Sequence, residues 1–351
     1  MRGCVRLRLR DCAYSRPPSS SAARSPAVGR GSLALAPQCL PEWLYPGGGL
    51  VAAALLLAHL LDLVYPFHRG ILLTMHPVHT SFILAKKLAP PGSSRLRGIV
   101  TWIVVVGSHL VVYAALLYAA WRLGPLAWLF AAAWVLKVSF SLRLLLETVW
   151  RAASCMERDD MICARRLVQG LVRRDVYRLS LGHVASAAVE SLAESLVDGY
   201  TSPIFYTVLL GPLGALLQRL ANTLDGTLGF KTPDYLEAGW ASAWADTLLN
   251  YLPARMTAVL LVLVTPLVGG NPRETLRVWR CYARVTESRN AGHPMSAMAG
   301  ALEVRLEKPG SYVLGAGPLP GPRDMKCGVM LTAAAAAVWL AVATALLPVL
   351  D

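Results

Sequence analysis

The stretch GIVTWIVVVGSHLVVYAALLYAAW, residues 98–121, contains no Asp, Glu, Lys or Arg. A helix of about 20 such residues crosses the roughly 30 Å hydrocarbon layer of a bilayer. Five further stretches lack the same four residue types and approach this length. They are residues 43–61, 123–136, 199–218, 256–272 and 327–350. Together they predict an all-α fold, a polytopic helical bundle that passes several times through the cell membrane.

The composition of the whole chain agrees with a membrane location. Of its 351 residues, 55% are hydrophobic and 16% are charged, and the mean hydropathy is +0.47. These values argue against a disordered chain, a fibrous chain or an ordinary soluble enzyme. The formal net charge is +13, but the positive residues do not gather into a binding face, so we expect membrane lipid and no nucleic acid as a partner.

The first 40 residues differ from the rest of the chain. They contain seven Arg and one Asp, so they supply six of the thirteen net positive charges, and they are rich in Ser and Pro. Such a segment cannot bury enough apolar surface to fold. We expect residues 1–40 to be a disordered leader, with a transit peptide or a misassigned start as alternatives. Residues 41–351 are expected to form a single helical membrane domain.

Charge and turn residues predict a topology for this domain. Residues 69–98 carry five basic residues and no acidic one, which is typical of a cytoplasmic segment. The link at 122–125 is so short that 98–121 and 124–146 should form an antiparallel hairpin. Residues 147–198 alternate apolar and charged side chains, which predicts a solvent-facing helical segment. Residues 252–268 and 328–349 are expected to be full spans.

The stretch 199–218 is expected to be broken. Pro203 and the pair Gly211-Pro212 interrupt it, and proline removes a helical hydrogen bond. We therefore predict two half-helices that line a cavity, where irregular backbone is tolerated within a membrane. This arrangement would bring the polar residues before and after the stretch to one side of the membrane, where they can share a site.

The seven cysteines show no CxxC pair and no nearby histidine cluster. This pattern indicates neither a zinc site nor a disulfide framework. We expect free thiols.

The densest polar signal is the segment AAVESLAESLVDG, residues 187–199. On a helix Glu190, Glu194 and Asp198 share one face at spacings of four, and no basic residue between them offsets their repulsion. One interpretation is a solvated acidic stripe. The alternative is a Mg²⁺ site, because carboxylate oxygens are ligands that Mg²⁺ prefers and the flanking sequence is apolar.

Two more polar clusters follow. In the first, Asn222 and Asp225 share a helix face and Lys231 follows as a possible phosphate ligand. A glycine cap at the helix end would explain Gly226 without function, but ionisable groups beside a membrane segment are costly and usually functional.

In the second cluster Asp246 and Asn250 lie four residues apart, and Arg255 follows Pro253. Arg255 is interpreted either as a residue that snorkels to the interface or as a bidentate clamp for phosphate or carboxylate. Farther on, Asn290 precedes a run of small residues that is typical of close helix packing.

Several motifs in one order resemble a known family. They are HPV at 76–78, RD at 174–175, ESLAE at 190–194 with DG at 198–199 and Pro203, NTLD at 222–225, the stretch 239–255, NAG at 290–292 with AMAG at 297–300, and SY at 311–312. Over roughly residues 50–315 the chain is similar to the adenosylcobinamide-phosphate synthase family, the membrane-bound proteins of cobalamin biosynthesis. The departures from the family pattern are Arg173, Ser195, Thr247 and His293.

The resemblance implies an ATP-dependent amide ligation. Its substrates would be the propionate carboxylate of the corrinoid adenosylcobyric acid and the amine of aminopropanol or its phosphate, and it would use Mg²⁺. Other cobalamin-pathway enzymes are possible partners. The chain has no GxxxxGK[ST] loop, so the nucleotide would bind by other means.

Site roles follow from the resemblance and from the polar clusters together. The expected catalytic residues are Glu190, Glu194, Asp198 and Asp246, the first three also holding the metal. The expected substrate and phosphate ligands are Arg174, Asp175, Asn222, Asp225, Lys231, Asn250, Arg255 and Asn290.

Two other function classes remain open. Polar residues on broken membrane helices are also typical of transporters, here for a corrinoid or an organic cation. However, such transporters usually have two related halves, and no repeat relates 50–200 to 200–351. A non-catalytic membrane scaffold would not require the carboxylates.

Overall fold

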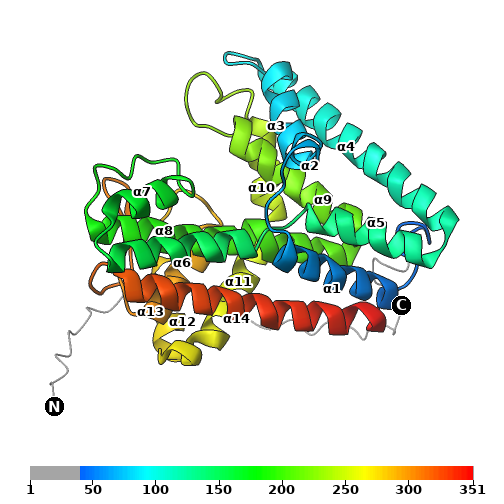
Figure 1. Ribbon diagram of the computed structural model, residues 1–351. Helices are drawn as coiled ribbons and strands as arrows, with labels where there is room; N and C mark the ends of the chain where they lie inside the picture. Colours follow the sequence, from blue (N-terminus) through cyan, green and yellow to red (C-terminus); the bar gives the residue numbers. More distant parts are fainter. Residues whose placement is uncertain (1–39, 351) are drawn as a thin grey trace, which may run out of the picture. The chain divides into compact units, whose positions relative to one another are not determined.

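The computed structural model describes residues 40–350 (Figure 1), so the predicted leader lies outside the described residues except for Leu40. The all-α prediction is confirmed, with one small β-hairpin as an addition. The helices are α1 (Gly48–Val64), α2 (Ile71–Thr74), α3 (Pro77–Leu88), α4 (Arg95–Leu123), α5 (Pro125–Lys137), α6 (Arg143–Glu157), α7 (Met161–Gln169), α8 (Leu181–Leu196), α9 (Ser202–Leu228), α10 (Trp240–Leu249), α11 (Tyr251–Val264), α12 (Pro272–Tyr282), α13 (Gly292–Leu302) and α14 (Pro322–Leu346). The short elements are η2 (Val197–Thr201), η3 (Thr265–Val268), η4 (Leu347–Val349), β1 (Leu306–Lys308) and β2 (Tyr312–Leu314).

Within residues 40–350 four helical segments are long and apolar enough to cross a membrane. They are Arg95–Leu123, Leu181–Leu228, Tyr251–Val268 and Pro322–Val349. Only 17% of the most apolar window of the first segment is buried inside the protein, against 61% for the second. The side chains of α4 therefore face outward, as expected for contact with lipid, whereas α8 and α9 form the centre of the bundle.

The predicted hairpin forms, but its second arm is shorter than predicted. The chain turns at Gly124, whose φ of +116° favours glycine, and α5 then ends at Lys137 rather than near residue 146. A new helix, α6, begins at Arg143. The buried carboxylate of Asp62 accepts hydrogen bonds from the backbone N–H groups of Leu142 and Arg143 at 3.3 and 3.0 Å. A side chain distant in sequence therefore caps α6 and makes this break favourable.

The prediction that 147–198 faces solvent is wrong for its last part. In α8 the residues from Val184 to Ala193 are all buried. Most of them are Ala, Ser or Val, which let neighbouring helices approach closely. The polarity of the wider segment comes from α6, α7 and the loop after them, and it conceals the apolar α8.

The predicted break at Gly211-Pro212 is confirmed. Gly211 has non-helical torsions, φ +69° and ψ −164°, within α9. A straight helix over the 48 residues 181–228 would be about 72 Å long, more than twice the thickness of a bilayer. Instead the chain turns back, as the proximity of residues before and after the break shows: a Cβ on Gly199 would lie 3.9 Å from Arg219 Nη1. In Figure 1 the second half of α9 runs back toward α10. At Pro203 the irregularity is the π-helical turn η2 just before α9.

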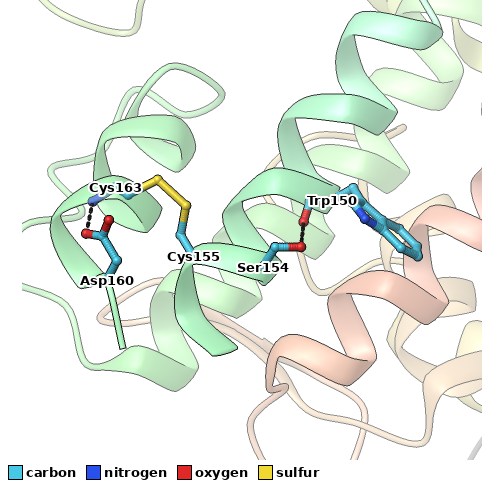
Figure 2. The surroundings of a disulfide bond; sticks show 5 residues. All are labelled: Trp150, Ser154, Cys155, Asp160 and Cys163. Carbon is cyan, nitrogen blue, oxygen red and sulfur yellow. Dashed lines mark hydrogen bonds between the residues drawn. A yellow bond between two sulfur atoms is a disulfide. The ribbon is translucent and has the colours of Figure 1, made fainter. Parts of the chain in front are cut away.

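The prediction of free thiols throughout is wrong for two cysteines. Cys155 at the end of α6 and Cys163 in α7 form a disulfide, with their Cα atoms 5.9 Å apart (Figure 2). Asp160 caps α7 by accepting a hydrogen bond from the Cys163 N–H at 2.9 Å. This cap begins α7 immediately after the turn and brings Cys163 back beside Cys155. The pair is separated by eight residues, so a search for CxxC does not find it.

The strands β1 and β2 form an antiparallel hairpin in which Lys308 pairs with Tyr312. Gly310, with φ +74°, occupies the turn. The hairpin is fixed to α8, because Ser186 Oγ accepts a hydrogen bond from the Glu307 N–H at 2.7 Å. It therefore holds Lys308 and Tyr312 near the acidic residues of α8.

Candidate active site

A cavity of about 490 Å³ lies where α8, α9, α10 and the β-hairpin meet. Four carboxylates line it: Glu194 from α8, Asp225 from α9, Asp246 from α10, and Glu287 from the segment between α12 and α13. Three basic residues also line it: Lys231, Arg289 and Lys308. We call this the carboxylate cavity. Three helices separated in sequence thus bring their acidic groups to one space beside fixed positive charge.

Asp246 is held by a network of amides. Its Oδ1 accepts hydrogen bonds from Asn222 Nδ2 at 3.1 Å and from Asn250 Nδ2 at 2.9 Å. Asn250 is 1% exposed, and its Oδ1 accepts a hydrogen bond from Gln218 Nε2 at 3.0 Å. Burial raises the pKa of Asp246 above its ordinary value, while the bonds from the two asparagines lower it. The structure thus assigns Asn222 and Asn250 to positioning of Asp246.

Glu194 and Asp198 have no such support. Neither side chain makes a hydrogen bond or an ion pair with any other part of the chain between residues 40 and 350. Glu194 opens into the carboxylate cavity. Asp198 lies one turn farther, at η2, and its neighbouring cation is Arg219. Both carboxylates therefore retain free oxygens for a ligand.

Glu190 differs from both, because its carboxylate oxygens are bonded to other groups of the protein. Its Oε1 accepts hydrogen bonds from Arg174 Nη2 at 2.9 Å and Ser186 Oγ at 2.7 Å, and its Oε2 accepts one from Tyr312 Oη at 2.7 Å. Only 6% of the Glu190 side chain and 17% of the Arg174 side chain are exposed. Because these partners use both oxygens, Glu190 and Arg174 form a closed pair inside the protein.

The residues of the carboxylate cavity fit a magnesium ion only together with a ligand. In the described part of the chain no three His, Cys, Asp or Glu residues are close enough to hold a metal among themselves. The predicted set of Glu190, Glu194 and Asp198 is therefore not assembled as a metal site. Mg²⁺ usually takes one or two carboxylates and fills its shell with water and phosphate oxygens. Asp225 and Asp246 fit that mode.

Two other expected ligands lie elsewhere. Asp175 is exposed and accepts a hydrogen bond from the Tyr177 N–H at 2.9 Å, so it closes a turn. Arg255 stacks over the Tyr251 ring, 3.5 Å from its centroid, and its Nη1 donates to Asn290 Oδ1 at 3.3 Å. Neither residue lines the carboxylate cavity. The stacking explains Arg255 without a bound anion.

Asn290 and Lys231 lie at the edge of the carboxylate cavity. Asn290 is buried, and its Nδ2 donates to the Thr247 backbone oxygen at 2.8 Å, which ties it to α10 beside Asp246. Lys231 lines the cavity and forms an ion pair with Glu287 at 2.8 Å, both side chains being exposed. A solvent-exposed pair of this kind is weak and opens readily.

Several lining residues are not among the predicted site residues, including Trp244, Arg289 and Lys308. Tyr312 belongs to a motif of the family resemblance, but nothing in the local pattern indicated its bond to Glu190. Lys308 and Arg289 stand in segments of mixed polarity with no characteristic spacing. The folding of the chain alone brings them to the cavity.

Comparisons with known proteins point to one family. A family model described as CobD/Cbib protein matches residues 55–335. The probable cobalamin biosynthesis protein CobD of Aeropyrum pernix is 51% identical over 307 residues, which cover 86% of this chain and 96% of that protein. The protein of the same name from Methanothermobacter thermautotrophicus is 38% identical over 266 residues, 75% of this chain and 86% of that protein.

A third relative is the cobalamin biosynthesis protein CobD of Mycobacterium tuberculosis, 36% identical over 292 residues, 80% of this chain and 91% of that protein. No solved structure matches the chain significantly. The match to the family model covers most of the chain and confirms the resemblance seen in the ordered motifs. The chain belongs to the CobD/Cbib family.

Proposed function

We propose that this protein acts in cobalamin biosynthesis as an ATP-dependent acid–amine ligase. It would join the propionate carboxylate of adenosylcobyric acid to the amine of aminopropanol or its phosphate. The family membership and the names of the relatives support the pathway. The observation that carries the ligase assignment is the carboxylate cavity, in which Glu194, Asp225 and Asp246 stand with three basic residues.

This distribution of charge suits the amine substrate. An ammonium group is attracted to unpaired carboxylates, and Glu194 offers oxygens that no other group in the described chain uses. A phosphate on the same small molecule would meet Lys231, Lys308 and Arg289. The amine must lose a proton before it can attack. Glu194, with no internal partner, is the proposed base.

The reaction consumes one ATP for each amide bond. A propionate oxygen attacks the γ-phosphorus of ATP, and the bond between this phosphorus and the β–γ bridging oxygen breaks. ADP departs, and the propionate becomes an acyl phosphate. The deprotonated amine then attacks the acyl carbon, phosphate leaves with the C–O electron pair, and the amide nitrogen loses its second proton to the medium. Fixed basic groups lower the barrier by stabilising charge that develops on the phosphoryl oxygens.

The metal would lie among the same carboxylates. Asp225 and Asp246 would hold Mg²⁺, which when bound would neutralise phosphate charge. Asn222 and Asn250 keep Asp246 oriented through its Oδ1.

A transporter for a corrinoid or an organic cation is the second candidate. The observation that favours it is the broken helix α9, whose halves meet at Gly211 and carry polar residues near a cavity. A ligase works in detergent solution, whereas transport requires two compartments.

The test is a product assay. Detergent-purified protein is incubated with adenosylcobyric acid, aminopropanol phosphate, ATP and Mg²⁺, and the amide product is sought by mass spectrometry. Reactions without ATP and with Glu194→Gln protein are the controls. ATP-dependent product formed only by the parent supports the ligase. No product from well-folded protein with either aminopropanol or its phosphate would contradict it.

A further inference from the structure

A second cavity, of about 590 Å³, lies beside the second half of α9. No Asp or Glu lines it. Its polar lining includes His68, His76, His79, Lys137, Arg219 and Asn222. We call it the basic cavity. Two fixed cations and no acid line this cavity, so it carries the positive charge expected of a site that binds an anion.

Lys137 is buried without a counter-ion. It is 2% exposed, and its Nζ donates one hydrogen bond, to His68 Nε2 at 3.2 Å. Asp62 is a neighbouring acid, but its Oδ2 caps α6 and it forms no ion pair with Lys137. The C-terminal end of α5 favours a cation at this position. That effect is too small to offset the cost of a buried charge.

Arg219 is also unpaired. Its side chain makes no hydrogen bond and no ion pair with any residue from 40 to 350, and its Nε is buried without a partner. Asp198 is near enough to favour its charge but does not bond to it. An arginine with five N–H donors and no acceptor is rare inside a protein. Its fork matches the oxygens of a phosphate.

The histidines support the same interpretation. Burial, followed by the positive charge of Lys137, lowers the pKa of His68 to about 4. Burial, with the neighbouring His68, Arg219 and Lys137, lowers the pKa of His76 to about 3. Both rings are therefore neutral at neutral pH. His76 Nδ1 accepts a hydrogen bond from the Val78 N–H at 3.2 Å, so its proton is on Nε2, which can donate.

We propose that the basic cavity binds a phosphate group, with Lys137 and Arg219 as its principal ligands. The site goes beyond the ligase proposal, which uses only the carboxylate cavity. The two cavities share a wall: Asn222 lines the basic cavity and donates to Asp246 of the carboxylate cavity at 3.1 Å. A phosphate bound here would lie on the other side of α9 from the carboxylates.

The experiment measures binding, so it does not depend on the ligation. Full-length protein is placed in phosphatidylcholine nanodiscs, and inorganic pyrophosphate is titrated by calorimetry and by melting temperature. The variants are Arg219→Gln and Lys137→Met, and the control is Lys87→Gln, an exposed lysine of α3 outside both cavities. We expect the parent and the control to bind pyrophosphate, and each cavity variant to bind at least about tenfold more weakly.

The melting temperature without ligand separates binding from structure. A buried, unpaired cation destabilises the empty protein, so Lys137→Met should melt at the same temperature as the parent or higher. If pyrophosphate binds the parent, both cavity variants and the control with equal affinity, the proposal is overturned. Cavity variants that melt lower yet bind normally would also overturn it, because the cations would then be structural.

A lipid headgroup could supply the same phosphate. A second arm therefore uses nanodiscs that contain phosphatidic acid and no pyrophosphate. Stabilisation of the parent relative to Arg219→Gln by this lipid assigns the phosphate to a headgroup, and stabilisation by pyrophosphate alone assigns it to a soluble molecule. A parent that responds in neither arm would contradict a phosphate site of either origin.

Discussion

Two glutamates one turn apart on the same face of α8 are in opposite states. Glu190 has both oxygens bonded, to Arg174, Ser186 and Tyr312. Glu194, one turn later, opens into the carboxylate cavity with no internal partner. A spacing of four residues puts both on one stripe. The comparison shows that the partners which the fold brings to a carboxylate, and not its position on the stripe, decide whether it supports the structure or remains free for chemistry.

The largest expected effect is on turnover, when Glu194 is replaced. Glu194→Gln should lower kcat at least about 100-fold, since it removes the proposed base and one charge of the cavity. The melting temperature should not fall, because the parent side chain makes no internal bond. Kinetics and thermal unfolding of the same preparation check both statements. An active Glu194→Gln protein across a Mg²⁺ titration would remove this residue from the mechanism.

Replacement of Glu190 should lower the stability of the protein. Glu190→Gln leaves the Arg174 guanidinium buried without its counter-charge, which costs about 3 kcal/mol or more in the free energy of unfolding. Denaturation in detergent measures this loss, with Glu194→Gln as the matched control one turn away. If Glu190→Gln is as stable as the parent, the closed pair does not have the structural role given to it here.

The third prediction concerns pH and Asp246. Because burial raises its pKa in the folded protein, the folded state keeps the proton to higher pH than the unfolded state, and stability is lost as pH rises through this pKa. Asp246→Asn should therefore melt higher than the parent at neutral pH, and the difference should vanish in acid. Melting curves from acid to neutral pH check this, and a lower melting temperature for Asp246→Asn at neutral pH would show that its charge is stabilising.

The smallest effect is expected outside the carboxylate cavity. Arg255 stacks on Tyr251 and bonds to Asn290, so Arg255→Lys should leave kcat/KM within about twofold of the parent. Lys308→Gln, which removes a cation from the cavity wall, should cost about tenfold. A large loss from Arg255→Lys with normal Lys308→Gln would place the anion contact at Arg255 and reverse this assignment.

Much of the fold follows from the sequence. Uncharged runs locate the long helices, because their length and apolar character are local properties. The break at Gly211-Pro212 is also local. The end of α5 is not a local property, since it depends on Asp62, which caps a helix distant in sequence. The burial of α8 is not local either, since it depends on the packing of small residues against other helices.

The site could be predicted only in part. Helical spacing found Glu194, Asp225 and Asp246, and the fold brings all three to one cavity. The same spacing could not separate Glu190 from Glu194, because two of the three partners of Glu190 come from a loop and from a hairpin over 100 residues away. Lys308, Arg289 and Arg219 carry no local signal, since single basic residues are common at membrane surfaces.

The most direct test compares Glu190 and Glu194 of α8 in one assay. Amide product from adenosylcobyric acid, aminopropanol phosphate, ATP and Mg²⁺ is measured by mass spectrometry for the parent, Glu190→Gln and Glu194→Gln, each normalised to folded protein. We predict that the parent and Glu190→Gln form product at similar rates per folded molecule, while Glu194→Gln forms at least about 100-fold less. Parent-like turnover by Glu194→Gln, or an equal loss in fully folded Glu190→Gln, would contradict the account.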